Sequence, residues 1–309
     1  MDPLLKAPAW ELEEEVIGVG NEIVYPDSFE INVLKQYLPE TDAILTVFSD
    51  VTREMISLAP NLKVIVKPGV GIDNIDLEYA TKSKVMVCNV AGVRGQAISE
   101  HVFFMILHIA RHAWMHNEQE KWRHIPGVQL AKKKIGIFGL GNIGMHVAKI
   151  AKGFDMDILV NTRTSDPTIC QDINIQFVSL ETILKNSDFI VLALPLLAET
   201  RGLICKQTIN LMKKNCILIN VSRGAIVVTD DLYDGIKFGK IYGAGLDVTD
   251  PEPLPEEHPI WELENVLITP HNSSRTPETQ DLAIQKTCEI LRDSLSGLVP
   301  ASVINPEIL

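Results

Sequence analysis

The chain has 309 residues, of which 46% are hydrophobic and 22% charged, a composition typical of a globular protein large enough for two domains. Its net charge of -12 argues against nonspecific binding to nucleic acid or to an acidic membrane, although a local basic site could still receive a phosphate. The longest apolar stretch, residues 102–110, is far shorter than the ~20 residues of a membrane span, and the acidic N-terminal region lacks a secretory signal pattern. The five cysteines are scattered without CxxC spacing, which predicts reduced thiols in a cytoplasmic protein without a metal site.

Short apolar runs alternate with helical patterns over residues 22–89, which predicts a small parallel α/β sheet with its own core. The predicted strands are Ile23–Tyr25, Ala43–Val47, Val64–Val66 and Val85–Val87, and the predicted helices are Phe29–Tyr37, Thr52–Leu58 and Leu77–Lys82. A flavodoxin-like half usually begins with a strand, whereas this chain opens on Met1-Asp2-Pro3. We therefore expect either a truncated start or a shortened sheet.

The loop at residues 67–76 has closely spaced glycines around Val70 and Gly71, which free backbone N–H groups to face a ligand. It follows a predicted strand, at the strand end where open α/β sheets bind ligands. A plain Pro-Gly turn explains the same residues.

A long apolar helix is predicted over Ile98–Trp114, suitable as a rigid link between domains. His108 and His112 have the HxxxH spacing of some metal sites, but no carboxylate accompanies them, which favours a surface or core role. The mixed aromatic and charged residues 114–123 predict an arm against a second subunit.

The centre of the chain, KIGIFGLGNIGMHVAKIAKG at residues 134–153, predicts a buried strand, a glycine-rich turn and a helix in succession. The turn is GLGNIG, in which Gly139, Gly141 and Gly144 allow tight turning, close approach of a pyrophosphate and close packing of helix on strand. Asn142 and Ile143 begin the helix, whose N-terminal N–H groups attract phosphates. We interpret the stretch as a dinucleotide site, the alternative being a tight turn without ligand.

The next predicted strand, residues 158–160, leads into Thr162, Arg163 and Thr164. NAD-type folds usually place a carboxylate here to hold the ribose 2′-OH. Its absence favours NADP over NAD, because a 2′-phosphate can pair with the Arg163 guanidinium and accept hydrogen bonds from the threonines. Alternatively, Arg163 is a solvated loop residue and selectivity is weak.

Four further strands are predicted at Phe189–Leu194, Cys216–Val221, Tyr242–Leu246 and Val266–Thr269, which continues the doubly wound pattern. Polar or rigid residues follow these strands and should line one crevice: Pro195, Ser222, Arg223, Asp247, Glu252 and His271. Arginine can hold a carboxylate, histidine can exchange a proton, and glutamate can orient the imidazole. Taken singly, each could equally be a surface residue, a loop charge or a capping group.

Six motifs occur in order: PGVGIDNIDL (68–77), GLGNIG (139–144), LALPLLAETRGLI (192–204), INVSRGAIV (219–227), GAGLDVTDPEPL (243–254) and NVLITPH (265–271). A chain with these motifs resembles the D-isomer-specific 2-hydroxyacid dehydrogenases, which include phosphoglycerate dehydrogenase, D-lactate dehydrogenase and glyoxylate/hydroxypyruvate reductases. The likeness covers nearly the whole chain.

The resemblance implies an α/β fold with a doubly wound Rossmann dinucleotide-binding domain, residues 97–276, and a smaller flavodoxin-like substrate-binding domain, residues 1–96 and 277–309. It implies that His271 is the general acid/base, Glu252 its partner and Arg223 a substrate ligand. The Val70 and Gly71 amides would bind the substrate carboxylate. Asp247 and the backbone of residues 221–223, which are Val221, Ser222 and Arg223, would contact the nicotinamide. A homodimer is implied as well.

Two departures refine the prediction. Thr162-Arg163 replaces the acidic residue of NAD-using members and is similar to the NADP-preferring glyoxylate/hydroxypyruvate reductases. Lys67-Pro68 stands where many relatives have an arginine and a small residue, so Lys67 either meets a substrate phosphate or is solvated. The predicted reaction is hydride transfer between NADP(H), with NAD possible, and C2 of a small 2-oxo acid or D-2-hydroxy acid. The alternatives are an NAD-dependent D-3-phosphoglycerate dehydrogenase and, from another class, a non-catalytic dinucleotide-sensing corepressor or scaffold.

Overall fold

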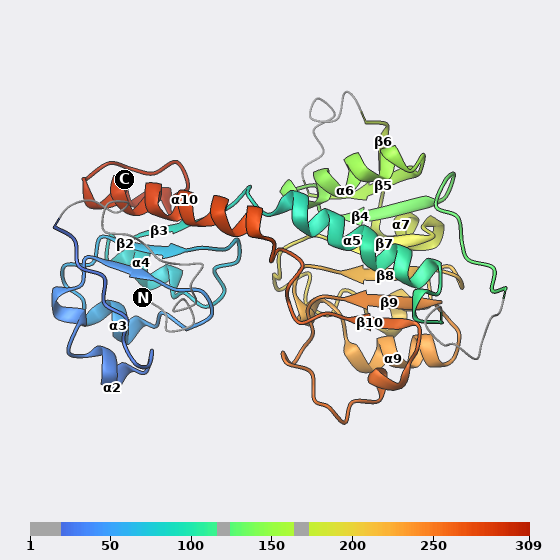
Figure 1. The fold of residues 1–309 in the computed structure, drawn as a ribbon, viewed down its shortest axis with the longest axis horizontal. Coiled ribbons are helices and arrows are strands. Elements are labelled where there is room, and N and C mark those ends of the chain that lie inside the picture. The colour runs from blue at the N-terminus through green and yellow to red at the C-terminus, as the bar shows by residue number, and fades with distance from the viewer. Residues whose placement is uncertain (1–19, 116–123, 164–172) are drawn as a thin grey trace. The chain divides into compact units, whose positions relative to one another are not determined.

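The computed structural model describes residues 20–115, 124–163 and 173–309. The chain divides into two compact units (Figure 1). Unit 1 contains the chain up to Val93 together with Thr276–Leu309, and unit 2 contains Arg94–Arg275. The boundaries expected from the sequence lie at 96/97 and 276/277. Among the helices of the described residues, none is long and apolar enough to cross a membrane.

Unit 2 is built on a parallel sheet of seven strands in the order β10-β9-β8-β7-β4-β5-β6. The strands are β4 (Lys134–Phe138), β5 (Asp157–Asn161), β6 (Ile175–Phe177), β7 (Phe189–Leu192), β8 (Ile217–Asn220), β9 (Gly243–Leu246) and β10 (Val266–Ile268). The helices are α5 (Gly95–Ala110), η4 (Ala113–Met115), α6 (Asn142–Gly153), α7 (Leu180–Asn186), α8 (Lys206–Ile209), η6 (Gly224–Ile226), α9 (Thr229–Lys237) and η7 (Pro259–Glu262).

The strands of unit 2 are buried on both faces, as their continuous apolar runs predicted. Because side chains alternate across a strand, Ile135 and Ile137 of β4 pack with α5 and α6, whereas Phe138 packs on the other face with α7. Figure 1 shows α5 lying across the sheet in front of the strands. The doubly wound, Rossmann-like fold predicted from the sequence is confirmed.

Unit 1 is a smaller α/β unit with a three-stranded parallel sheet, β1 (Ala43–Leu45), β2 (Val64–Lys67) and β3 (Met86–Asn89). Its helices are α2 (Ile31–Leu34), η3 (Leu38–Glu40), α3 (Arg53–Ser57), α4 (Leu77–Lys82), α10 (Pro277–Leu295) and η8 (Pro306–Ile308). One face of β2 packs with α10 and the other with α3 and α4, so this sheet is also covered on both sides.

Helix α10 belongs to unit 1, and its ends follow known capping rules. The Thr276 hydroxyl accepts a hydrogen bond from the Thr279 amide, and Pro277 is the first helical residue. Gly297, just beyond the helix, has a φ of +81°, a conformation that glycine adopts without steric cost.

The strand predicted at residues 23–25 is wrong, because the segment forms no strand and β1 is an end strand of the described sheet. Residues 23 and 24 and strand β1 instead line a hollow of about 510 Å³. A strand forms only with hydrogen bonds to a neighbouring strand, and an apolar run by itself does not specify that neighbour.

Candidate active site

The carboxyl ends of the seven parallel strands of unit 2 lie at one edge of the sheet. Strands β4 and β7 are neighbours, but the chain continues from β4 towards β6 and from β7 towards β10, in opposite directions. Such a reversal of strand order is where open α/β sheets form a ligand crevice. The predicted site residues of unit 2 follow β4, β5, β7, β8, β9 and β10 at this edge.

The glycine turn after β4 has three glycines in three different environments. Gly139 has a φ of +89°, and a Cβ on it would lie 2.4 Å from the Ala193 carbonyl oxygen. A Cβ on Gly144 would lie 2.1 Å from the Gly139 oxygen, so helix α6 packs tightly against the turn. A Cβ on Gly141 would meet nothing within 4 Å. Open space beside the N-terminus of a 12-residue helix fits a pyrophosphate.

Asn142 and Ile143 occupy the first turn of α6. Ile143 packs partly buried against the core shared with α5. The Asn142 side chain lies beside Gly95 of α5. A Cβ added to Gly95 would lie 2.1 Å from Asn142 Oδ1. Gly95 therefore lets α5 pack close to the start of α6.

The residues after β5 are held to the glycine turn, since the Gly139 amide donates to the Asn161 carbonyl at 2.8 Å. Thr162 is half-buried, and the Arg163 side chain is 77% exposed. One guanidinium nitrogen of Arg163 lies 3.8 Å from Oε1 of Glu199, which comes from the loop after β7. The predicted residue Thr164 lies outside the described residues.

The turn after β8 is fixed by Asn220, a buried polar residue at the end of an apolar strand. Its side-chain carbonyl accepts from the Ser222 amide at 3.1 Å, and its amide donates to the Arg223 carbonyl at 3.0 Å. The Ser222 hydroxyl donates to the Leu194 carbonyl, which ties this turn to the loop that contains Pro195. Val221 is buried in the core, whereas Arg223 is half-buried.

Glu252 and His271, predicted as partners, are in contact. His271 Nδ1 lies 2.5 Å from Glu252 Oε1, and the two side chains are 40% and 41% exposed. A carboxylate accepts hydrogen bonds, so Nδ1 carries the proton of this bond. His271 has a φ of +48°, in the left-handed region that residues with a Cβ seldom adopt.

Asp247, predicted to contact the nicotinamide, is the centre of a hydrogen-bond network, with 1% of its surface exposed. Its carboxylate accepts from the Thr269 hydroxyl at 2.6 Å and from the amides of Asn272 and Ser273 at 2.9 and 3.1 Å. Its backbone carbonyl accepts from the His271 amide at 2.9 Å. Asp247 thus holds the turn that contains His271.

The sequence did not single out Asn220, Thr269 or the role of His101, which reaches this network from α5. A polar residue at the end of an otherwise apolar strand was a usable signal for Asn220. His101 gave no such signal, because only the packing of α5 on the sheet brings it near Thr269. Burial lowers the pKa of His101, and the negative charge of Asp247 opposes that shift.

In unit 1, Val70 and Gly71 lie in the loop after β2, where the Val70 carbonyl accepts from the Asn89 side chain at 2.7 Å. The sequence left Lys67 open between a ligand for a substrate phosphate and a solvated lysine. Lys67 is half-buried, and its ammonium group donates to Asn74 Oδ1 at 2.7 Å and to the Val47 carbonyl. An ammonium can only donate, and both of these protein oxygens accept from it.

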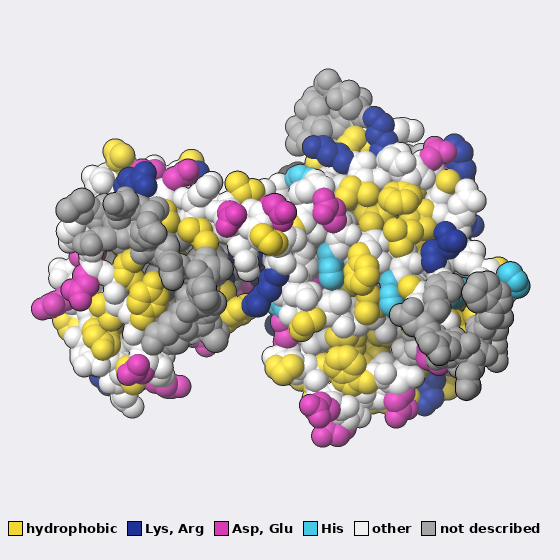
Figure 2. Space-filling model, viewed as in Figure 1, with side chains coloured by type: hydrophobic (Ala, Val, Ile, Leu, Met, Phe, Trp, Pro, Cys, Tyr) yellow, Lys and Arg dark blue, Asp and Glu magenta, His cyan; other side chains and the backbone are white. Residues whose placement is uncertain are grey.

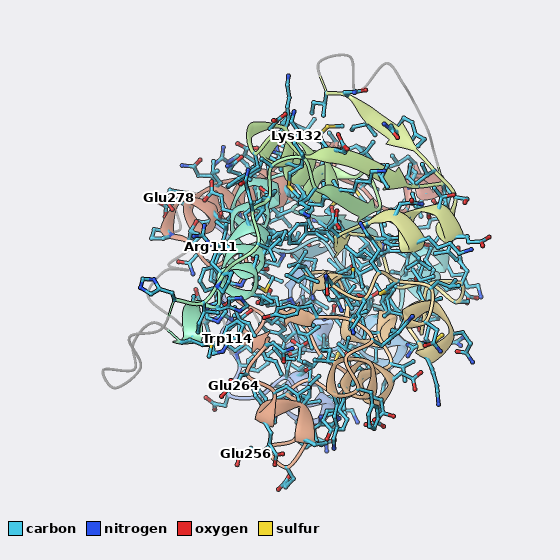
Figure 3. All side chains as sticks on the ribbon, turned by 90° about the vertical axis from the view of Figure 1, so that its right-hand side faces the viewer. Arg111, Trp114, Lys132, Glu256, Glu264 and Glu278 are labelled. Carbon is cyan, nitrogen blue, oxygen red and sulfur yellow. The ribbon has the colours of Figure 1, made fainter. Side chains whose placement is uncertain are left out.

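The histidines of the HxxxH pair contact aromatic groups. His112 Nδ1 lies 2.9 Å from the Tyr242 hydroxyl, and the His108 ring lies beside Trp114. Figure 3 labels Trp114 and Glu264, which line a shallow hollow beside the end of α5. The described residues include no group of three or more His, Cys, Asp or Glu side chains that could hold a metal ion.

Comparisons with known proteins agree with this geometry. The family profile described as D-isomer specific 2-hydroxyacid dehydrogenase, NAD binding domain, matches residues 102–273. Glyoxylate reductase from Thermococcus litoralis is 39% identical over 290 residues, covering 90% of this chain and 87% of that protein. The structure of a glyoxylate reductase from Paecilomyes thermophila matches with a TM-score of 0.81 at 27% identity, covering 88% of this chain and 85% of that one. An acyclic imino acid reductase in complex with NADPH and D-Arg matches with a TM-score of 0.83 at 28% identity, covering 92% and 91%.

Proposed function

Because this chain belongs to the D-isomer specific 2-hydroxyacid dehydrogenase family, we propose that it is a 2-oxo acid reductase of the glyoxylate/hydroxypyruvate type. The proposed reaction is hydride transfer between NADP(H) and C2 of a small 2-oxo acid or D-2-hydroxy acid. The observation that carries the proposal is the pair of His271 and Glu252, 2.5 Å apart at the carboxyl ends of the strands. Glyoxylate reductases that are 33–39% identical to the chain support the same substrate class.

Each polar group has a proposed task in the reduction. The bound reduced nicotinamide supplies the hydride. The Arg223 guanidinium binds the substrate carboxylate and polarises the neighbouring carbonyl, which makes C2 more electrophilic. His271 Nε2–H gives its proton to the carbonyl oxygen as negative charge develops there. Glu252 stabilises the imidazolium through Nδ1, and in the reverse direction Nε2 takes the proton back from the substrate hydroxyl.

We further propose that Val70 and Gly71 of unit 1 supply amides for the substrate carboxylate, and that unit 2 binds the dinucleotide. Gly139, Gly141 and Gly144 support the second assignment, because the turn leaves open space only at the middle glycine of the three. Asp247, Pro195 and the backbone of residues 221–223 would bind the nicotinamide half.

The function is tested by steady-state turnover of glyoxylate, hydroxypyruvate, pyruvate, phenylpyruvate and phosphohydroxypyruvate with NADPH and with NADH. His271→Gln should lower kcat by about 10²- to 10⁴-fold. His258→Gln is the matched control, since His258 also contacts a carboxylate, that of Asp230 at 3.2 Å, in unit 2. Equal losses in both variants would contradict the assignment. Tight cofactor binding without turnover on the whole panel would favour the corepressor or scaffold, and NADH-dependent turnover of phosphohydroxypyruvate alone would favour phosphoglycerate dehydrogenase.

The preference for NADP is proposed from Arg163, whose exposed guanidinium could pair with a 2′-phosphate. Glu199, 3.8 Å away, should weaken that pairing because its charge repels a phosphate. We expect Arg163→Ala to weaken NADPH binding about 10-fold or more and NADH binding little, and Glu199→Gln to strengthen NADPH binding selectively. Binding of each cofactor by isothermal titration checks both variants. Equal effects on the two cofactors would remove Arg163 as the determinant.

We also propose a homodimer. Figure 2 shows hydrophobic and histidine side chains along the outer face of α5, where Phe104 is 49% exposed. At the end of the helix, Trp114 Nε1 is buried and has no hydrogen-bond partner among the described residues. A second copy could cover this face, and light scattering should then report a dimer for the native chain and a monomer for Phe104→Glu. A native monomer would refute the proposal.

A further inference from the structure

His101 connects the long helix α5 to the turn that contains His271. Its Nε2 lies 3.1 Å from the Thr269 hydroxyl and 3.9 Å from Asp247 Oδ1. The side chain is only 18% exposed, and its ring lies beside that of Phe104 with 5.4 Å between the ring centroids. The residue is thus a largely buried polar group directed at the Asp247 network.

The proton positions in this contact follow from the hydrogen bonds. The Thr269 hydroxyl donates its single proton to Asp247 Oδ1 at 2.6 Å. Thr269 Oγ1 has no second proton to give, so it accepts a hydrogen bond from His101. The proton of the His101 ring is therefore on Nε2. The order of donation is therefore His101 Nε2 to Thr269 Oγ1 to Asp247 Oδ1.

Asp247 in turn determines the backbone around His271. Its carboxylate accepts from the amides of Asn272 and Ser273, and its carbonyl accepts from the amide of His271. The φ of +48° at His271 has a steric cost, because the Cβ approaches the following carbonyl oxygen in this conformation. These three hydrogen bonds oppose that cost, and a displaced Asp247 carboxylate would release two of them.

We propose that His101 is a positioning residue that keeps the Asp247 carboxylate in place through Thr269 and thereby holds the His271 imidazole against Glu252. The proposal rests on the proposed function in that His271 is taken as the proton donor. His101 touches neither substrate nor cofactor in this role. Helix α5, which also packs on the sheet and on α6, would then contribute to catalysis as well as to packing.

His101→Phe removes the donor while keeping a ring of similar size, and His101→Gln restores an N–H donor. His108→Phe is the matched control, because His108 lies on the same helix and its ring also contacts Phe104. We expect His101→Phe to lower kcat by about 10- to 100-fold, as expected for a misplaced catalytic group. His101→Gln should recover most of the loss, and His108→Phe should retain native kcat. Failure of His101→Gln to exceed His101→Phe would overturn the proposal.

Thr269→Val removes the hydroxyl that links His101 to Asp247, and it keeps the shape of the side chain. If the two residues act in series, the double variant of His101→Phe and Thr269→Val should lose no more kcat than the worse single variant. Losses that multiply would mean that His101 acts independently of Thr269, contrary to the proposal.

Amide hydrogen exchange tests the positioning role without substrate or turnover. In His101→Phe, exchange at Asn272 and Ser273 should accelerate about 10-fold or more, with other segments of unit 2 unchanged. Native exchange rates at both amides would overturn the proposal. If His271→Gln kept native turnover, the proposed function would fail instead, and the exchange result would still decide whether His101 holds the turn.

Discussion

The glycine turn after β4 allows the dinucleotide assignment to be tested by two alanine substitutions three residues apart. At Gly141 the backbone has a φ of -78° and a ψ of -162°, which alanine adopts readily, and the new Cβ would meet nothing within 4 Å. At Gly144 the new Cβ would lie 2.1 Å from the Gly139 oxygen and 3.3 Å from Ile137 Cγ2. The first substitution fills the proposed pyrophosphate space, and the second forces the backbone apart.

The two variants should therefore fail in different ways. Gly144→Ala overpacks against backbone and should cost about 1–3 kcal/mol, a fall in Tm of roughly 2–12 °C. Gly141→Ala should change the free energy of unfolding by less than about 1 kcal/mol. Alanine is a weaker N-cap of α6 than Gly141, but it also lowers the conformational entropy of the unfolded chain, and the two effects oppose each other. It should nevertheless weaken NADPH and NADH binding alike by at least about 10-fold, or about 1.4 kcal/mol, because the methyl group occupies the space of a phosphate.

Scanning calorimetry gives Tm, and fluorescence titration of NADPH and NADH gives Kd. Native cofactor affinity in Gly141→Ala, measured on folded protein, would refute the placement of the pyrophosphate at this turn. Native Tm in Gly144→Ala would show instead that the packing of α6 on the turn is looser than the distances imply.

Three further outcomes follow from the geometry. Glu252→Gln, which keeps the shape but removes the charge beside His271, should lower kcat by about 10- to 100-fold with Kd for NADPH unchanged in titrations, and unchanged kcat would exclude the pair from proton transfer. Burial raises the pKa of the Cys88 and Cys288 thiols to about 11, so mass spectrometry after iodoacetamide at pH 7.5 should find the partly exposed Cys205 alkylated well before them. Faster labelling of Cys88 would show that unit 1 opens readily. Burial is the main cause that lowers the pKa of His101 and His108 in the folded protein from the ordinary value of 6.5. Below about pH 6.5 these histidines therefore bind more protons in the unfolded chain than in the folded protein. The stability that the neutral histidines contribute is present above that pH and is lost as the pH falls towards their lowered pKa. Tm should fall between about pH 7.5 and 5, and less steeply in the double variant of His101→Gln and His108→Gln.

The sequence by itself determined the features that depend on neighbouring residues. Apolar runs such as Ile135–Phe138 specified buried strands because both faces of a doubly wound sheet are dry. GLGNIG specified the turn because a Cβ does not fit at Gly139 or Gly144. The placement of polar residues after successive strands was enough to predict that Glu252 and His271 meet. The run at residues 23–25 was mispredicted because an apolar segment does not specify its partner strand.

Only the tertiary structure decided which distant groups share a hydrogen bond. The contact of Asp247 with the nicotinamide stays a prediction, whereas its bonds to Thr269, Asn272 and Ser273 and the link to His101 on α5 are seen only in the structure. The sequence favoured Arg163 as a phosphate ligand without sight of Glu199, and it left Lys67 open between a phosphate ligand and a solvated lysine without sight of Asn74. Hydrogen bonds and ion pairs act over about 3–4 Å, so they depend on how separate loops pack, and spacing along the chain carries no record of that distance.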